Sequence, residues 1–154
     1  MNNFVATGKR LSCIALQINK AHKAKPFDQI WDCCCDHGYL GVALLNSFSK
    51  LSEQSPKINF IDQVEHITQA LRNKLELQNF EHYKVITQDA GQLLFNHKQH
   101  HCIVIAGVTT NGMIKLIKQL LGNHPQQELE FILCPTRGIY DLRHYLINEM
   151  MILI

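Results

Sequence analysis

The chain has no apolar run long enough to cross a membrane, because no segment approaches the roughly 20 apolar residues that a transmembrane helix needs. Its first residues, 1–18, also lack the unbroken apolar stretch of a secretory signal peptide. Internal repeats and low-complexity segments are absent as well, which argues against a repeat array or a disordered linker. We therefore expect a soluble, cytoplasmic protein with no membrane partner.

Neither sign of charge is in large excess, since the formal net charge is only +2. Charged residues make up 18% of the chain. Such a balance neither requires nor excludes a polyanionic partner. Basic residues do gather near the start of the chain, and the favoured interpretation is a solvated helix face, with a local RNA-binding patch as the alternative. These residues are Lys9, Arg10, Lys20, Lys23 and Lys25.

No C-x-x-C spacing is present, although the chain has six cysteines. Most of them lie in apolar runs, where a reduced thiol behaves as a small hydrophobic group, so we expect no disulfide framework. The Cys33–Cys35 triplet beside Asp36 and His37 raises the hypothesis of a metal site. Successive strand residues point to opposite faces, however, so the prediction is that no metal binds there. For His100 and His101 we expect an exposed loop that leads into a strand.

The length of 154 residues and the hydrophobic content of 46% predict a single folded domain that spans the whole chain, 1–154. Short apolar runs alternate with amphipathic segments, a pattern typical of parallel strands joined by crossover helices. Residues 1–25 are expected to hold an N-terminal helix, and residues 26–154 an α/β core. Because such crossovers are right-handed, the prediction is a mostly parallel, doubly wound sheet with helices on both faces.

The expected elements follow from the periodicity of the apolar residues. The predicted strands are Gln29–Cys35, Ile58–Asp62, Tyr83–Thr87, His101–Ala106 and Leu129–Cys134. The predicted helices are Leu11–Ile18, Gly38–Phe48, Val64–Leu75, Gly112–Leu121 and Gly138–Met150. The last residues, Met150–Ile154, resemble the start of a sixth strand.

Acidic residues follow three of the predicted strands, where open parallel sheets bind their ligands. Asp32 and Asp36 belong to the turn after the first strand, Asp62 follows the second and Asp89 the third. Carboxylates at these places fit a nucleoside with a cationic head, since they can accept hydrogen bonds from ribose hydroxyls and an adenine amino group. The missing G-x-G-x-x-G argues against a dinucleotide. Asp62 and Asp89 could instead be ordinary helix caps.

Five stretches of the chain, WDCCCDHGYLG, FIDQ, TQDAGQLL, IVIAGVTTNGMI and LCPTRGIYDLRHYL, together resemble the bacterial tRNA (adenine-22-N1)-methyltransferase family. The similarity runs in the family's order from about residue 8 to residue 150. It implies a Rossmann-like methyltransferase fold, S-adenosylmethionine as cofactor and tRNA as partner. The implied reaction moves the methyl group to N1 of an adenine, and this step needs alignment of the reactants rather than a general base.

The resemblance also implies a role for individual residues, grouped by the part of the ligand that they contact. The implied cofactor-binding residues are Asp32, Cys34, Asp36, His37 and Gly38 for the methionine part, Asp62 and Gln63 for the ribose, Asp89 and Ala90 for the adenine, and Ala106 and Gly107 on the methyl-donor side. The candidates for positioning the substrate base are Asn111, Thr136, Tyr39 and Arg10, of which Arg10 matches a basic pair of the family. No catalytic acid or base is assigned.

The chain also departs from the family's pattern at several places. Cys34 stands where the family has glycine, so its side chain is expected to crowd the cofactor. The loops Gly107–Gly112 and Cys134–Thr136 differ from the family's substrate loops, and the final strand hairpin and C-terminal helical extension have no counterpart, so the fold is expected to be C-terminally truncated. These departures leave open a second hypothesis, a degenerate methyltransferase fold that binds nucleoside or RNA without turnover, or that binds tRNA weakly.

Overall fold

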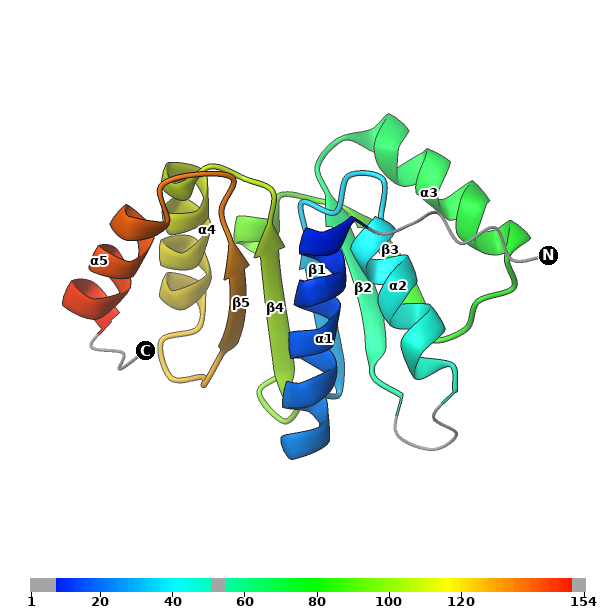
Figure 1. The fold of residues 1–154 in the computed structure, drawn as a ribbon, viewed down its shortest axis with the longest axis horizontal. Coiled ribbons are helices and arrows are strands. Elements are labelled where there is room, and N and C mark those ends of the chain that lie inside the picture. Colours follow the sequence, from blue (N-terminus) through cyan, green and yellow to red (C-terminus); the bar gives the residue numbers. More distant parts are fainter. Residues whose placement is uncertain (1–7, 51–54, 151–154) are drawn as a thin grey trace.

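The computed structural model describes residues 8–50 and 55–150, which form a five-stranded, wholly parallel sheet with helices on both faces (Figure 1). The strand order is β3-β2-β1-β4-β5, so the direction of winding reverses between β1 and β4. The predicted α/β class and doubly wound topology are confirmed. The strands are β1 (Gln29–Cys33), β2 (Lys57–Asp62), β3 (Tyr83–Thr87), β4 (His101–Ala106) and β5 (Glu130–Cys134).

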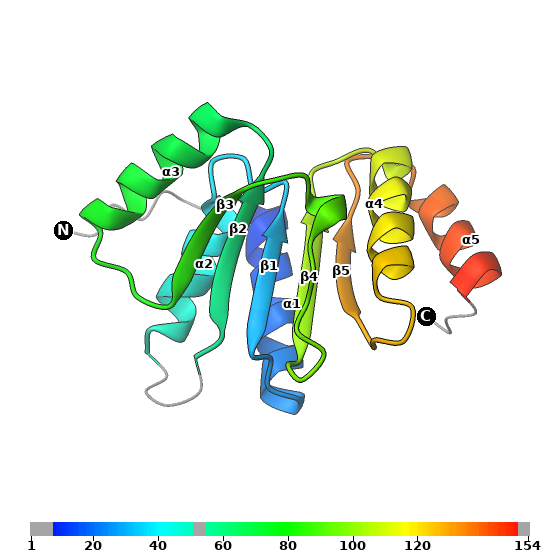
Figure 2. The same ribbon diagram turned by 180° about the vertical axis from the view of Figure 1, so that it is seen from behind.

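Every predicted helix is present, with small shifts at the ends. The helices are α1 (Lys9–Ala24), α2 (Tyr39–Phe48), α3 (Glu65–Leu77), the short 3-10 helix η1 (Ala90–Gln92), α4 (Thr110–Asn123) and α5 (Ile139–Met150). Figures 1 and 2 show α1, α2 and α3 on one face of the sheet and η1, α4 and α5 on the other. Met150, expected to begin a sixth strand, ends α5 instead, and the rest of that expected strand lies outside the described residues.

The sheet separates two hydrophobic cores, and alternate residues of each strand contribute to one or the other. On β1, Ile30 packs with α1, α2 and α3, whereas Trp31 packs with η1, α4 and α5. On β4, Val104 and Ile105 divide in the same way. Because side chains alternate along a strand, both faces of these central strands are buried, which explains their continuous apolar runs.

The predicted first strand is two residues too long, because β1 ends at Cys33. Cys34 and Asp36 have φ values of 59° and 49°, in the left-handed region where a strand cannot continue. The Cys35 amide still donates to the Ile61 carbonyl at 3.0 Å, so the turn stays attached to β2. Gly38, with φ of 72°, then directs the chain into α2.

His100 precedes β4 and His101 begins it, as the predicted loop and strand have it, but the expected exposure of the two side chains is wrong. His101 is the first residue of β4 and is only 1% exposed. Its Nδ1 accepts a hydrogen bond from Nε1–H of Trp31 at 3.0 Å, and its Nε2 lies 2.8 Å from the Asn96 carbonyl, to which it must donate. This pairing requires the neutral ring with its proton on Nε2.

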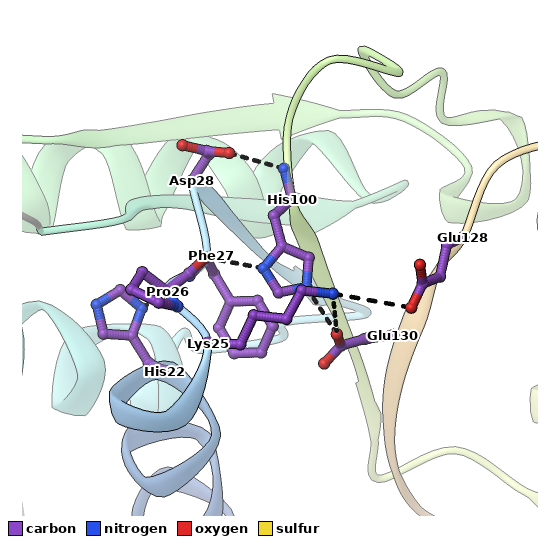
Figure 3. Close-up of polar contacts among 8 residues, drawn as sticks. All are labelled: His22, Lys25, Pro26, Phe27, Asp28, His100, Glu128 and Glu130. Atoms are coloured by element: carbon purple, nitrogen blue, oxygen red, sulfur yellow. Dashed lines mark hydrogen bonds and ion pairs between the residues drawn. The ribbon is translucent and has the colours of Figure 1, made fainter.

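His100 joins three segments at the amino ends of the strands (Figure 3). Its Nδ1 lies 2.8 Å from the Pro26 carbonyl and its Nε2 lies 2.7 Å from Oε1 of Glu130, which also pairs with Lys25 at 3.4 Å. The His100 amide donates to Asp28 at 2.7 Å. The end of α1 and the segment before β1 are thereby held against β4 and β5, at the rim opposite the predicted site.

Burial lowers the pKa of His101, so the folded state favours the neutral ring. The stability that this ring contributes is present above the pKa of an unfolded histidine, about 6.5, and is lost as the pH falls below it. We expect the stability advantage of the wild type over His101→Gln to shrink between pH 7 and pH 5 in urea unfolding. His97→Gln, at an exposed position, serves as control. A stability difference between wild type and His101→Gln that widens toward pH 5 would contradict the neutral ring of His101.

Gly41 allows α2 to lie close to β2, because a Cβ at this position would overlap the ring of Phe60. We expect Gly41→Ala to lower the free energy of unfolding by about 1–3 kcal/mol, the usual cost of overpacking a core. Gly122→Ala, within α4 and with no atom near the added Cβ, is the matched control and should stabilise slightly. Equal urea midpoints for wild type and Gly41→Ala would show that the core accommodates the methyl group.

Candidate functional site

A pocket of about 200 Å³ opens at the carboxyl ends of β1 and β4, where the strand order changes direction. Open α/β sheets bind their ligands at this kind of position. Its lining residues are Arg10, Leu11, Asp32, Cys34, Cys35, Asp36, His37, Tyr39, Leu40, Ala106 and Gly107. Eight of these were singled out from the sequence, and the structure brings them together from α1, β1, α2 and β4.

Three lining residues were missed by sequence reasoning, namely Leu11, Cys35 and Leu40. Leu11 and Leu40 are in the first turns of α1 and α2, and both pack against the core as well as lining the pocket. The apolar periodicity of the two helices already predicts that these leucines pack in the core, so nothing in the sequence marks them as pocket residues as well. Cys35 was expected inside β1, and its position in a turn was the missing information.

Asp32 lies at the buried base of the pocket, with only 4% of its surface exposed. Its Oδ2 accepts a hydrogen bond from the amide of Gly41 at 3.1 Å, which joins the end of β1 to the first turn of α2. Burial raises the pKa of this carboxyl to about 7, the Gly41 hydrogen bond opposes the shift, and the charge of Asp62 adds to it. Asp32 therefore changes its charge near neutral pH.

Asp62 and Asp89 both accept hydrogen bonds from local backbone, but only Asp89 caps a helix, as the alternative expected. The N-cap residue of α3 is Val64, and no side chain caps that helix. Asp62 accepts from the amide of Asp36 at 3.2 Å through Oδ2 and from that of Val64 at 3.0 Å through Oδ1. Asp89 caps η1 by accepting from the Gly91 amide at 2.9 Å. Both carboxylates remain half-buried at the carboxyl ends of β2 and β3, so their backbone hydrogen bonds and a position on the ligand-binding rim coexist.

The thiol of Cys34 lies among these acidic side chains. Burial raises its pKa to about 11, with further contributions from the charges of Asp62, Asp32 and Asp89, in that order. Asp32, which lies within β1 and not in the turn after it as expected, and the carboxylates that follow β2 and β3 all lie within electrostatic reach of one side chain. The predicted gathering of acidic residues along one rim of the sheet is confirmed, whereas Gln63 is exposed beside Asp62.

A cation faces this acidic group across the pocket. Arg10 reaches over from the first turn of α1, and both terminal guanidinium nitrogens lie 3.8 Å from the place of a Cβ on Gly107. Gly107 has φ of 81° and donates its amide to the Cys134 carbonyl at 3.1 Å, which fixes the turn after β4. The pocket thus combines one positive and several negative groups, a pattern that suits a zwitterionic ligand.

The remaining candidates surround the pocket to different degrees. Tyr39 lines it, is 41% exposed and lies 5.7 Å from the His37 ring, centroid to centroid. Thr136 does not line it, but its amide donates to the Val108 carbonyl at 3.0 Å, so the loops after β4 and β5 are linked. Asn111 is exposed in the first turn of α4. Ala90 is buried in η1.

Within residues 8–50 and 55–150, no group of three or more His, Cys, Asp and Glu side chains is arranged to hold a metal ion. Alternation along a continuous strand would place Cys33 and Cys35 on the same face. They belong to the cores on opposite faces of the sheet instead, because β1 ends at Cys33 and the left-handed Cys34 turns the chain. None of the helices in this part of the chain has both the length and the apolar character to cross a membrane.

A family model described as a methyltransferase domain matches residues 7–154. The chain belongs to this methyltransferase family. Comparison with curated proteins finds no match. The acidic strand ends and the pocket at the switch point therefore lie within a methyltransferase domain.

Solved structures of similar fold include two from bacteria. Sp1610 of Streptococcus pneumoniae, a proposed tRNA (m1A22) methyltransferase, is 24% identical with a TM-score of 0.71, and the alignment covers 91% of this chain and 58% of that one. M. capricolum TrmK in complex with S-adenosylhomocysteine is 17% identical with a TM-score of 0.65, and the alignment covers 92% of this chain and 57% of TrmK. A second structure of Sp1610, in complex with S-adenosylmethionine, is 24% identical to this chain with a TM-score of 0.68. The alignment covers 90% of this chain and 60% of Sp1610. The chain therefore spans less than two thirds of the length of these proteins.

Because the pKa of Asp32 is raised, the folded state favours its protonated form, and the stability linked to that form is lost as the pH rises through about 7. Asp32→Asn mimics the protonated carboxyl and can still accept from Gly41. In urea unfolding, we expect the free energy of unfolding of the variant to match that of the wild type near pH 3, below the unfolded pKa of 3.8. The variant should gain an advantage that is already present at pH 5 and reaches about 1 kcal/mol or more at pH 8. Glu81→Gln, at an exposed position, is the charge-loss control. A variant less stable than the wild type at pH 8 would show that the ionised carboxylate is favoured by the fold.

Proposed function

We propose that this methyltransferase domain uses S-adenosylmethionine to methylate N1 of an adenine in tRNA. The observation that carries the proposal is the arrangement of Arg10, Asp32 and Asp36 around the pocket, next to the rim that holds Asp62 and Asp89. The family match supports the reaction type. The similarity to Sp1610 and TrmK supports tRNA as the substrate.

The residues present fit the cofactor in charge and in hydrogen-bonding capacity. The guanidinium of Arg10 can bind the carboxylate of the methionine part, and Asp36 can bind its ammonium group. Asp62 can accept from the ribose hydroxyls and Asp89 from the adenine amino group, while each keeps its backbone hydrogen bond. When bound, S-adenosylmethionine supplies an electrophilic methyl group.

The residues of this chain would then contribute mainly by orienting the two reactants. Adenine N1 is unprotonated at neutral pH and needs no general base, so alignment of the nitrogen with the methyl group is what the protein must supply. Such orientation is worth roughly 7 kcal/mol or more. Tyr39 can stack on the base, and Asn111 can donate a hydrogen bond to its edge from the first turn of α4. The hydroxyl of Thr136 donates to the Val108 carbonyl at 3.4 Å and can accept from the base.

A degenerate methyltransferase that binds its ligand without turnover is the second candidate. The observation that favours it is Cys34, whose side chain lines the pocket from a left-handed backbone position. The two functions make different predictions, because only the enzyme moves the methyl group to RNA.

The decisive experiment incubates the protein with unmodified tRNA and methyl-labelled S-adenosylmethionine, followed by nucleoside analysis. We expect label in 1-methyladenosine and in no other nucleoside. Label in a cytosine or in the protein would contradict the proposed substrate. Binding of S-adenosylhomocysteine without any transfer would favour the second candidate. No binding by calorimetry would overturn the enzyme, and it would leave only binding of RNA without turnover.

A variant tests the role of the adenine-binding carboxylate separately. Asp89→Asn retains an oxygen that caps η1 but loses the charge, so we expect about tenfold weaker binding of S-adenosylhomocysteine with an unchanged melting temperature. Asp141→Asn, in the first turn of α5 and outside the pocket lining, is the control and should bind like the wild type. Unchanged affinity of Asp89→Asn would remove this residue from the proposed site.

A further inference from the structure

We propose that the exposed side of α4, together with the turn before α5, binds the phosphate backbone of the RNA that carries the target adenine. The basic face, as this surface is called below, consists of Lys115 and Lys118 of α4 and Arg137 of the turn. All three residues are exposed, and none of them lines the pocket. The inference rests on the proposed function and names the surface that would hold its substrate.

The two lysines lie on the solvent-facing side of α4, in line with Asn111. Residues three or four positions apart share one side of a helix, and Asn111, Lys115 and Lys118 have this spacing and are all exposed. The other side of α4, with Met113 and Ile117, is buried in the core. At 1.5 Å per residue, the two lysines lie about 6 and 10 Å along the axis from Asn111. An RNA strand whose base contacts Asn111 can therefore place neighbouring phosphates on both lysines.

Arg137 is held beside the start of α4 by hydrogen bonds of its main chain. The hydroxyl of Thr110 donates to the carbonyl of Arg137 at 2.6 Å, with the carbonyl of Gly138 at 3.0 Å. Gly138 has φ of 75°, and a Cβ there would lie 2.8 Å from the Thr110 hydroxyl oxygen. The close approach of this turn to α4 therefore requires glycine. It fixes the main chain of Arg137 next to the first turn of α4, where Asn111 lies.

The three cations of the basic face have few carboxylates around them. Residues 90–127, which include η1, β4 and α4, contain no aspartate or glutamate. In the described part of the chain, no ion pair involves Lys115, Lys118 or Arg137. Lys118 lies instead over the ring of Tyr145, 5.3 Å from its centroid. These charges are not neutralised within the molecule and are available to phosphates.

The ligand-binding edge of the sheet is acidic on one half and basic on the other. Asp36, Asp62 and Asp89 follow or end β1, β2 and β3, whereas Lys115 and Arg137 follow β4 and β5. RNA carries a negative charge on every nucleotide, so the acidic half repels its backbone and the basic half attracts it. We therefore expect the RNA to reach the pocket across β4 and β5.

The lysines of α1 form a second basic surface, but they lie away from the pocket. Lys20 and Lys23 are about 15 and 20 Å along the helix from Arg10. Lys25, the next cation, pairs with Glu130 at the amino ends of the strands. Figures 1 and 2 also show α1 and α4 on opposite faces of the sheet. The exposed Lys20 and Lys23 have the same spacing as the α4 lysines and therefore make a matched control.

The test measures the binding of an unmodified tRNA transcript by fluorescence anisotropy over a range of salt concentrations. Each phosphate contact contributes about one to the slope with which log affinity falls against log salt. We expect Lys115→Gln/Lys118→Gln to lower this slope by about two and to weaken binding about tenfold or more in low salt. Lys20→Gln/Lys23→Gln should retain the wild-type slope. Both double variants should bind S-adenosylhomocysteine like the wild type in calorimetry.

Asp141 supplies a test of opposite sign on the same surface. It lies in the first turn of α5, and its Oδ2 is 3.5 Å from the place of a Cβ on Gly138. Its charge is therefore next to the turn that holds Arg137. We expect Asp141→Asn to bind the tRNA transcript about two- to fivefold more tightly, the range for one exposed charge. Weaker binding by this variant would contradict the position of the basic face.

The outcomes separate this inference from the proposed function. An unchanged slope in Lys115→Gln/Lys118→Gln, with 1-methyladenosine still formed, would overturn the inference alone and leave this face to an acidic protein partner. A lower slope in the α1 control only would place the RNA on α1 and overturn the inference as well. Lower slopes in the α4 variant without any methyl transfer would support the basic face and contradict the proposed reaction. No binding of tRNA by the wild type would overturn both.

Discussion

Two carboxylate-to-amide hydrogen bonds hold the turn that follows β1, and the pocket depends on them. Asp32 accepts from Gly41 at 3.1 Å and thereby attaches α2 to the strand below it. Asp62 accepts from Asp36 at 3.2 Å and fixes the turn against the end of β2. Together with the backbone bond from Cys35 to Ile61, these two bonds hold the left-handed residues of the turn in one conformation. The site is thus built by the same side chains that give it its charge.

This double use of the carboxylates has an energetic consequence. A buried acid such as Asp32 favours its neutral form, while a site for a cationic ligand favours the charged one. The fold resolves the conflict through geometry, since the Gly41 amide supports the charge from one side and the pocket opens on the other. A ligand with a positive group would therefore favour the ionised form of Asp32, so ligand binding and the charge of Asp32 are coupled.

Much of the architecture could be predicted from periodicity alone, because strands buried on both faces and amphipathic helices leave clear patterns. The rim could be predicted too, since Asp62 and Asp89 follow apolar runs, and parallel strands all end at one edge. The failures share a cause. The end of β1 depends on left-handed φ values at Cys34 and Asp36, and the burial of His101 depends on Trp31, which is 70 residues distant in sequence. Neither feature is encoded in local composition.

The two halves of the proposed reaction rest on different parts of the molecule. The groups for the cofactor come from α1 and the carboxyl ends of the strands, where backbone hydrogen bonds fix Asp62 and Asp89. The groups for the substrate base come from the first turns of α2 and α4 and from the loop after β5, which is joined to the loop after β4 through Thr136 and Val108. The cofactor groups are attached to the core, whereas the substrate loops are attached largely to each other. Changes in the loops can therefore alter which base is aligned while leaving the cofactor site in place, so binding and transfer are separable properties of this fold.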